Sequence, residues 1–446
     1  MKKFLILIPL VLFLGCSRKG NHTIRIAGSP GNSEISVAEL KTNDSTYVDT
    51  IVGGSYSFVI SDLKDNYIEL KLDEWIPLYA EPGDSIFIHY DKANIQVQFS
   101  GNGFEESEYL FKGRELMKEL GFGDPRMIDI ALFSSNPESF LKSVDSIKQV
   151  RTKLLRDYKD LNPNISDNFF NTESLLIDYY WINQQFGYPG FYEMLTNTKA
   201  ELPGNYYQFT DQVEPGQAEL FKFKVYREAL SAYLDHKAKD FQDKYLLAKE
   251  LFTEKEMFEE IIYAKFITYI NFNGTDGLDS IYQDFLPYIN DQERKEFLTG
   301  KYNSWSRLAI GEKAPEFEIA DDGGNVVRLS DFYGKFVYID CWSSFCGPCL
   351  KEMPEMKKLS DEYKNENIVF ISISADDDRE KWLSKIKEFQ FTNTVNLWTA
   401  GTNHPFNNDY NAKAFPRYIL IDEKGNILDA TADNPSMIKE KLEQLL

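Results

Sequence analysis

Residues 336–350, with the sequence FVYIDCWSSFCGPCL, decide the fold of the last part of the chain. Phe336–Ile339 is a short run of aromatic and β-branched residues, which is typical of a buried strand. The run continues through Asp340 into Cys346-Gly347-Pro348-Cys349. Four apolar residues then follow at helical spacing: Leu350, Met353, Met356 and Leu359. The stretch therefore predicts a strand that leads into a C-x-x-C pair at the start of a helix.

The spacing of the two cysteines suits disulfide exchange. A cysteine at a helix N-terminus faces unpaired backbone N–H groups and the positive end of the helix dipole, so its thiolate is favoured. A second cysteine one turn later is shielded and can attack the mixed disulfide that the first one forms. We assign Cys346 as the nucleophile and Cys349 as the resolving cysteine.

The surrounding sequence predicts an α/β domain over residues 306–446. Three strand-like runs, at Phe336–Ile339, Ile368–Ile373 and Tyr418–Ile421, alternate with helical stretches. This alternation is typical of βαβ units around a parallel or mixed sheet.

The C-x-x-C pair, the strand before it, Glu352 and Pro354 resemble the thioredoxin superfamily. They are most similar to the membrane-tethered TlpA/ResA-type thiol–disulfide oxidoreductases, some of which serve cytochrome c maturation. The resemblance covers roughly the last third of the chain. It implies a thioredoxin-like fold, protein disulfides as substrates, a role in cell redox homeostasis, and no cofactor beyond the redox-active pair Cys346–Cys349.

The resemblance also implies roles for two carboxyl groups. Asp340 matches the buried acid beneath the active site of ordinary thioredoxins. A carboxyl group in an apolar site has a raised pKa, so it could take the proton of Cys349 during resolution. Glu352 matches the helix glutamate of the tethered subgroup and could do similar work. The alternatives are an ion-pair partner for Asp340 and a solvent-facing residue for Glu352.

A loop late in the sequence completes the expected site. Phe415-Pro416 matches the loop whose cis-proline faces the two sulfurs and pairs with the substrate backbone. Relatives commonly have Thr, Val or Ile before that proline, so the bulkier Phe415 puts the width of the substrate in question. We predict five substrate contacts, with Trp342 chiefly a packing wall: Trp342, Gly347, Pro348, Phe415 and Pro416.

Neither a third redox thiol nor a metal site is expected. Cys341 follows Asp340 on the strand, so its side chain points to the opposite face, as a buried inert cysteine would. No second pair of Cys or His residues with ligand spacing follows the C-x-x-C, and the four His residues stand far apart.

The first residues predict export and lipidation. Basic Met1-Lys2-Lys3 precedes the apolar run Phe4–Leu14 and Gly15-Cys16. This run is too short to span a hydrocarbon core of about 30 Å but long enough for a secretory signal. A small residue before a lone Cys resembles the lipobox of bacterial lipoproteins, although Phe13 stands where Leu is usual. We predict a signal peptide over 1–15 and lipidation of Cys16; the alternative is an ordinary cleaved signal.

Charge and flanking sequence narrow the partners and the location. The 446-residue chain is 43% hydrophobic, as expected for a folded protein, and carries a net charge of -21, which argues against nucleic acid as a partner. Ser17-Arg18-Lys19-Gly20 lacks the acidic run that resembles a surface-export signal. We therefore expect a lipid anchor on the periplasmic side of the outer membrane.

Residues 16–103 predict a small antiparallel β-sandwich. Ile24 and Ile26 alternate with less apolar neighbours, and Gly53-Gly54 and Pro82-Gly83-Asp84 are turn sequences. The phrase Ala80–Ser85 resembles the β-domain that often precedes thioredoxin modules in lipoproteins of anaerobic Gram-negative bacteria.

Residues 104–305 predict a helical domain. Asn136-Pro137 has the pattern of a helix start, and Thr253–Glu256 has capping-box spacing. The aromatic stretch Tyr179-Tyr180-Trp181 fits either a binding groove or a helix–helix core, and the core is favoured.

Three functions are compatible with these features. The first is a periplasmic thiol–disulfide oxidoreductase that reduces protein disulfides, since Gly-Pro between the cysteines resembles reductants, with electrons from a membrane-bound donor. The second is a scaffold or substrate-binding lipoprotein with an auxiliary redox domain. A thiol peroxidase is disfavoured because Ser343 stands where that family has Thr. The regions before residue 306 would restrict which disulfides reach Cys346, or join two copies into a homodimer.

Overall fold

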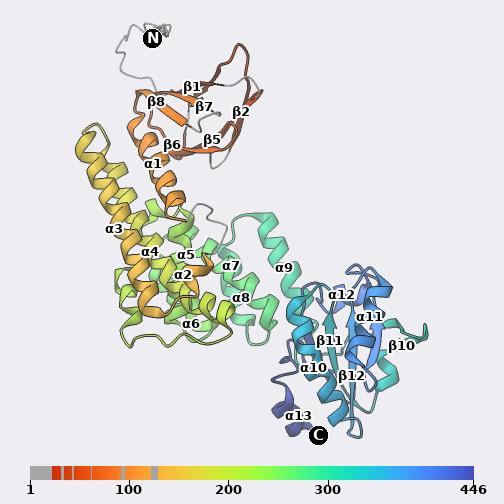
Figure 1. Cartoon of the computed structure of the whole chain (residues 1–446). Coiled ribbons are helices and arrows are strands. Elements are labelled where there is room, and N and C mark those ends of the chain that lie inside the picture. The colour runs from red at the N-terminus through yellow and green to blue at the C-terminus, as the bar shows by residue number, and fades with distance from the viewer. Residues whose placement is uncertain (1–22, 32–34, 43–44, 62, 92–95, 122–128) are drawn as a thin grey trace. The chain divides into compact units, whose positions relative to one another are not determined.

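A computed structural model describes residues 23–31, 35–42, 45–61, 63–91, 96–121 and 129–446 (Figure 1). The predicted signal peptide and Cys16 lie outside the described residues. Backbone contacts divide the chain into two compact units, Met1–Tyr233 and Leu234–Leu446, which we call the N-terminal unit and the C-terminal unit. Among the described residues, no helix is long and apolar enough to cross a membrane.

The N-terminal unit begins with two four-stranded sheets, ordered β4-β1-β7-β8 and β3-β2-β5-β6. The strands are β1 (Ile24–Pro30), β2 (Val37–Lys41), β3 (Thr46–Thr50), β4 (Tyr56–Ile60), β5 (Tyr67–Lys71), β6 (Trp75–Tyr79), β7 (Ser85–Asp91) and β8 (Gln96–Asn102). Alternate residues of both sheets, such as Ile26 and Leu70, share one buried core, which confirms the β-sandwich.

One pairing in the sandwich differs from the prediction. Strands β1 and β7 pair in parallel, with Ile26 opposite Ile86, so the expectation of a wholly antiparallel sandwich is wrong. Between β1 and β7 the chain forms the strands of the second sheet. These two strands are therefore not joined by a tight hairpin, which would require them to be antiparallel.

Helices complete the N-terminal unit and share a core with the second sheet. They are α1 (Glu105–Glu119), α2 (Ile130–Phe133), α3 (Pro137–Leu161), α4 (Asp167–Thr196), η1 (Tyr206–Gln212), η2 (Ala218–Leu220) and the first part of α5 (Lys224–Lys237). As predicted, Asn136 caps α3: its side chain accepts a hydrogen bond from the Ser139 N–H at 2.9 Å. Buried Tyr79 packs edge-on against Phe169 of α4, with ring centroids 4.8 Å apart. These contacts join the sheet and the helices within one unit.

The C-terminal unit opens with four more α-helices. They are α6 (Phe241–Leu251), α7 (Lys255–Asn273), α8 (Asp279–Phe285) and α9 (Gln292–Ser306), with the short turn η3 (Leu286–Tyr288) before α9. The helix predicted after Thr253–Glu256 is present as α7, but the capping box is wrong. Glu254 occupies the N-cap position, and its side chain makes no capping hydrogen bond to the described helix. Because α7 begins one residue later than the box requires, Thr253 lies outside the cap.

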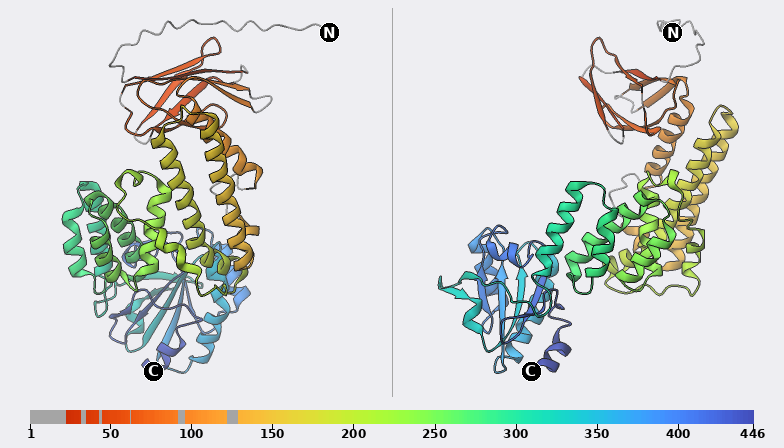
Figure 2. Two further views of the ribbon diagram at one scale, coloured as in Figure 1. Left: turned by 90° about the vertical axis from the view of Figure 1, so that its left-hand side faces the viewer. Right: turned by 180° about the vertical axis from the view of Figure 1, so that it is seen from behind.

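The rest of the C-terminal unit is a seven-stranded sheet ordered β10-β9-β13-β12-β11-β14-β15 (Figures 1 and 2). Its strands are β9 (Glu318–Asp321), β10 (Val326–Arg328), β11 (Phe336–Trp342), β12 (Ile368–Ser374), β13 (Val395–Trp398), β14 (Arg417–Ile421) and β15 (Ile427–Asp429). Strand β11, an interior strand, runs parallel to β12 and antiparallel to β14. The predicted strands and the α/β class are confirmed.

Helices cover this sheet on both faces. They are η4 (Leu329–Phe332), α10 (Gly347–Glu362), α11 (Arg379–Phe389), α12 (Pro405–Asp409) and α13 (Lys439–Leu445). One face of the sheet packs in a single core with α10, α11 and α13, and this core includes both Cys346 and Cys349. The sheet therefore places the C-x-x-C at the junction of interior strand β11 and α10.

Candidate active site

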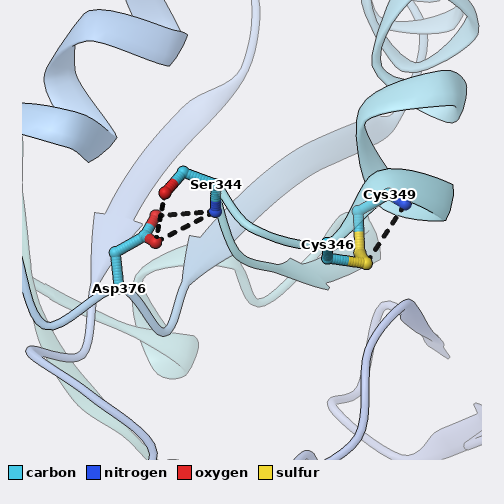
Figure 3. Close-up of a disulfide and its surroundings, with 4 residues drawn as sticks. All are labelled: Ser344, Cys346, Cys349 and Asp376. Carbon is cyan, nitrogen blue, oxygen red and sulfur yellow. Dashed lines mark hydrogen bonds between the residues drawn. A yellow bond between two sulfur atoms is a disulfide. The ribbon is translucent and has the colours of Figure 1, made fainter.

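The C-x-x-C pair lies where β11 turns into α10. Cys346 is the N-cap residue of α10, and Cys346 and Cys349 form a disulfide (Figure 3). The Cys349 N–H donates a hydrogen bond to the Cys346 Sγ at 3.2 Å. An amide of the first helical turn is thus directed at the sulfur predicted to attack substrate, and it would stabilise a thiolate there.

The two sulfurs differ in access to solvent. Cys346 is 9% exposed, whereas Cys349 is 1% exposed beneath it. A substrate disulfide can therefore approach Cys346, while Cys349 is reached from inside the domain. This order suits the predicted roles of nucleophile and resolving residue.

Asp376, which sequence reasoning missed, holds the turn before Cys346 (Figure 3). Its Oδ1 accepts hydrogen bonds from the Ser344 N–H at 2.9 Å and from the Ser344 Oγ–H at 2.7 Å. Its Oδ2 accepts from the Ser374 Oγ–H at 2.8 Å. Asp376 is 2% exposed, so these bonds satisfy a buried carboxylate. A signal was available: the residue follows β12, and polar side chains at the carboxyl ends of adjacent parallel strands meet at one sheet edge.

Asp340 lies on the same face of β11 as Tyr338 and Trp342, which belong to the core around the cysteines. Burial, and secondarily the charge of Glu352, raise the pKa of Asp340 to about 8. Its Oδ1 is buried and accepts no hydrogen bond from any residue that the structure describes. The ion-pair alternative therefore has no support among the described residues, and the raised pKa suits the group to exchange a proton near neutral pH.

Glu352 is half-buried on α10 and tied to the C-terminal part of the chain. Its Oε2 accepts hydrogen bonds from the Ser436 N–H at 3.1 Å and from the Ser436 Oγ–H at 2.7 Å. Its negative charge contributes to the raised pKa of Asp340. The structure thus brings Glu352 to Ser436 and into the electrostatic neighbourhood of Asp340.

Trp342 occupies the position of a packing wall, its main predicted role, and its burial argues against the secondary role of substrate contact. Its side chain is 0% exposed, and its Nε1–H donates to the Ser372 Oγ at 2.7 Å. The residue packs in the core that contains Cys346 and Cys349, so it acts only as the packing wall.

The other predicted contact residues lie nearer the surface. Gly347, Pro348 and Pro416 are exposed, and Phe415 is half-buried against the core that holds the cysteines. The Phe415–Pro416 peptide bond is cis, as predicted. Sequence reasoning missed Phe345, which directly precedes Cys346 and is 75% exposed. An exposed aromatic beside the reactive sulfur is suited to contact a protein substrate.

Cys341 lies on the opposite face of the sheet, as predicted. It is buried, and burial raises the pKa of its thiol. Arg417 lies opposite Cys341 on the neighbouring strand β14. This residue was not singled out from the sequence. The Arg417 guanidinium lies 4.1 Å from the ring centroid of Trp305 in α9 and donates to the Ala430 carbonyl oxygen at 2.7 Å. Burial lowers the pKa of Arg417 to about 10. Arg417 thus attaches α9 to the strand that follows the cis-proline.

Comparisons with known proteins agree with this geometry. Residues 309–446 match the family model described as Redoxin. Thiol-disulfide oxidoreductase ResA of Bacillus cereus is 29% identical over 147 residues, covering 33% of this chain and 82% of ResA. Thioredoxin-like protein YneN of Bacillus subtilis is 30% identical over 150 residues, covering 32% of this chain and 85% of YneN. The chain belongs to the redoxin family.

Solved structures were also found to be similar to part of this chain. A thiol-disulfide oxidoreductase of Bacteroides fragilis is 27% identical and matches 30% of this chain and 100% of its own length, with a TM-score of 0.29. The thioredoxin domain of a Bacteroides vulgatus thiol-disulfide oxidoreductase is 28% identical and matches 31% of this chain and 98% of its own length, with a TM-score of 0.29.

The redoxin domain of this chain is a thiol–disulfide oxidoreductase whose reactive pair is Cys346–Cys349. Its chemistry resides in these two sulfurs. In the described ranges, no group of three or more His, Cys, Asp or Glu side chains is arranged to hold a metal ion.

Proposed function

We propose that the redoxin domain reduces protein disulfides on the periplasmic side of the outer membrane, where a lipid on Cys16 anchors the chain. The observation that carries the reductase proposal is the pairing of Cys349, which is 1% exposed, with Cys346, which is 9% exposed and whose sulfur accepts a hydrogen bond from an amide of α10. Exposed Phe345, Pro348 and Pro416 offer a surface to an approaching polypeptide.

The reaction proceeds by two exchange steps. The Cys346 thiolate attacks one sulfur of the substrate disulfide, forming a mixed disulfide and releasing the other substrate sulfur as a thiolate. The Cys349 thiolate then attacks the Cys346 sulfur, releasing the second substrate thiolate and forming the Cys346–Cys349 disulfide. Two electrons have passed to the substrate, and a membrane-bound dithiol donor returns the pair to its reduced form.

Asp340 would take the proton of the Cys349 thiol during resolution. Its pKa of about 8 lies close to that of an unperturbed thiol, so the transfer needs little driving force. The half-buried Glu352 would pass the proton toward solvent.

The direction of the reaction is tested by the reduction potential of the full chain, measured by equilibration in dithiothreitol or glutathione redox buffers. We expect a value below about -200 mV, in the range of thioredoxin-like and glutaredoxin-like reductants. A potential above about -150 mV would make the protein an oxidant and overturn the proposed direction.

Substrates are tested by trapping. Cys349→Ser in the native host should accumulate mixed disulfides between Cys346 and substrate proteins, and the double variant Cys346→Ser/Cys349→Ser should accumulate none. A trap that remains empty would favour the alternative of a scaffold with an auxiliary redox domain. Incorporation of labelled palmitate, lost in Cys16→Ser, tests the anchor.

A further inference from the structure

The N-terminal unit contains an open cleft of about 560 Å³, separate from the redox chemistry. One wall is the sheet β3-β2-β5-β6, which contributes Tyr67 and Leu78, and the other is formed by α1, α3, α4 and the segment 222–227. Its volume lies within the range of small-molecule binding sites.

The cleft is more positive than the protein around it. Five Lys or Arg side chains and three Asp or Glu side chains line it, although the whole chain carries a net charge of -21. A concave site lined mainly by one sign of charge concentrates ligands of the opposite sign. The cleft therefore favours an anion.

Two of its acidic groups are engaged by the protein itself. Buried Glu173 accepts a hydrogen bond from the Tyr67 hydroxyl at 3.0 Å. Asp65, 7% exposed, pairs with the Lys222 ammonium at 2.9 Å. Burial also raises the pKa of Glu173, which diminishes its negative charge in the cleft. These groups fix the walls and leave the positive charge of the site in excess.

Arg151 of α3 lines the same cleft, and its charge partly offsets the rise in the pKa of Glu173. Arg151 is half-buried, and its guanidinium lies 5.0 Å from the ring centroid of Tyr180. Among the described residues, no acceptor forms a hydrogen bond or ion pair with it. Leu110 and Leu176 line the same cleft and give it apolar surface. The planar fork of a guanidinium matches a carboxylate.

We propose that this cleft binds a small organic acid whose carboxylate pairs with Arg151 and whose apolar body packs against Tyr180, Leu110 and Leu176. The cleft would recognise a ligand that carries one negative charge on an apolar body. The site lies in a different unit from Cys346 and needs no redox step.

Isothermal titration calorimetry of the full chain tests the proposal with two probes that share one frame, 4-phenylbutyrate and 4-phenylbutylamine. We expect the acid to bind with a Kd below about 1 mM and the amine to bind at least about tenfold more weakly. Arg151→Gln should weaken the acid at least about tenfold, because a charge-assisted bidentate contact is lost. The matched control Arg156→Gln, an exposed arginine on the same helix, should leave the affinity unchanged.

Three results would overturn the proposal: no heat of binding for the acid up to about 10 mM, equal affinity for acid and amine, or equal affinity of Arg151→Gln and wild type. Catalysed insulin reduction in Arg151→Gln should equal that of wild type, which separates this site from the proposed reductase function. Should Arg151→Gln fail to fold, Arg151→Lys serves instead: it keeps the charge, loses the fork, and should show intermediate affinity.

Discussion

In the C-terminal unit the reactive groups stand within four consecutive residues, Cys346 to Cys349, whereas the cleft of the N-terminal unit collects charges from positions as distant as Lys41 and Arg227. A strand-to-helix junction can build a nucleophile locally because the helix supplies its own amides. A cleft needs two walls, and here one is a sheet and the other a set of helices. The first site is therefore visible in a sequence pattern, and the second emerges only when the chain is folded.

The largest expected effect is the loss of disulfide reduction when the attacking cysteine of the C-terminal unit is replaced. Cys346→Ser should lower dithiothreitol-dependent insulin reduction at least about 100-fold, to the uncatalysed rate, because the attacking sulfur is gone. Cys341→Ser is the control and should retain the rate, since Cys341 lies buried on the other sheet face. Equal loss in both variants would contradict the assignment of Cys346–Cys349 as the sole reactive pair.

Loss of the carboxylate that supports the reactive turn should be the next largest effect. Asp376→Ala should lower the free energy of unfolding by about 2–4 kcal/mol, because the Ser344 amide and two serine hydroxyls lose their acceptor. Urea unfolding measures this change. The thiol pKa of Cys346, followed by ultraviolet absorbance of the reduced protein, should rise as the turn loosens, and Asp376→Asn should show a smaller change. An unaltered stability would mean that the turn is held by other contacts.

Asp340 should make stability depend on pH. Its pKa is raised from 3.8 to about 8 on folding, so the folded state holds the proton more tightly than the unfolded state. As the pH rises from 3.8 to about 8, the free energy of unfolding of wild type should therefore fall relative to that of Asp340→Asn. The expected slope is on the order of 1.4 kcal/mol per pH unit. Parallel stability curves for the two proteins over this range would show that the carboxyl is not desolvated.

The same substitution should slow resolution of the mixed disulfide. Without a carboxylate near Cys349, the thiol must lose its proton to water, so the rate in Asp340→Asn should follow the thiolate fraction alone. Stopped-flow measurement with a mixed disulfide formed on Cys346 checks this. Equal rates in wild type and variant above pH 8, where Asp340 is ionised, would exclude Asp340 as the base.

The smallest expected effect concerns the attachment of α9 to β14. Arg417→Lys should lower the free energy of unfolding by about 1–3 kcal/mol, because lysine cannot both stack on Trp305 and donate to the Ala430 carbonyl. The thiol pKa of Cys346 should stay unchanged. Thermal unfolding of the C-terminal unit measures the first effect; a shifted thiol pKa would instead show that α9 tunes the redox site.

Much of the redox domain could be predicted because its signals are local. The strand Phe336–Trp342, the helix after Cys346 and the burial of Cys341 follow from short-range periodicity and alternation. Trp342, next to the site along the chain, was predicted chiefly as a packing wall with substrate contact as a secondary role, and the inward face of β11 buries it completely. Phe345, two residues before the helix, takes the exposed position instead.

The sequence alone determined the β-sandwich, the helical stretches, the α/β domain and the identity of the reactive pair, because each depends on patterns of a few adjacent residues. Tertiary structure decided the parallel pairing of β1 with β7, the support of the reactive turn by Asp376, and the position of Arg151 in its cleft. These features depend on which distant strands and helices become neighbours. Which strands and helices become neighbours is set by the burial of entire apolar sheet and helix faces against one another. A short stretch of sequence does not contain that information.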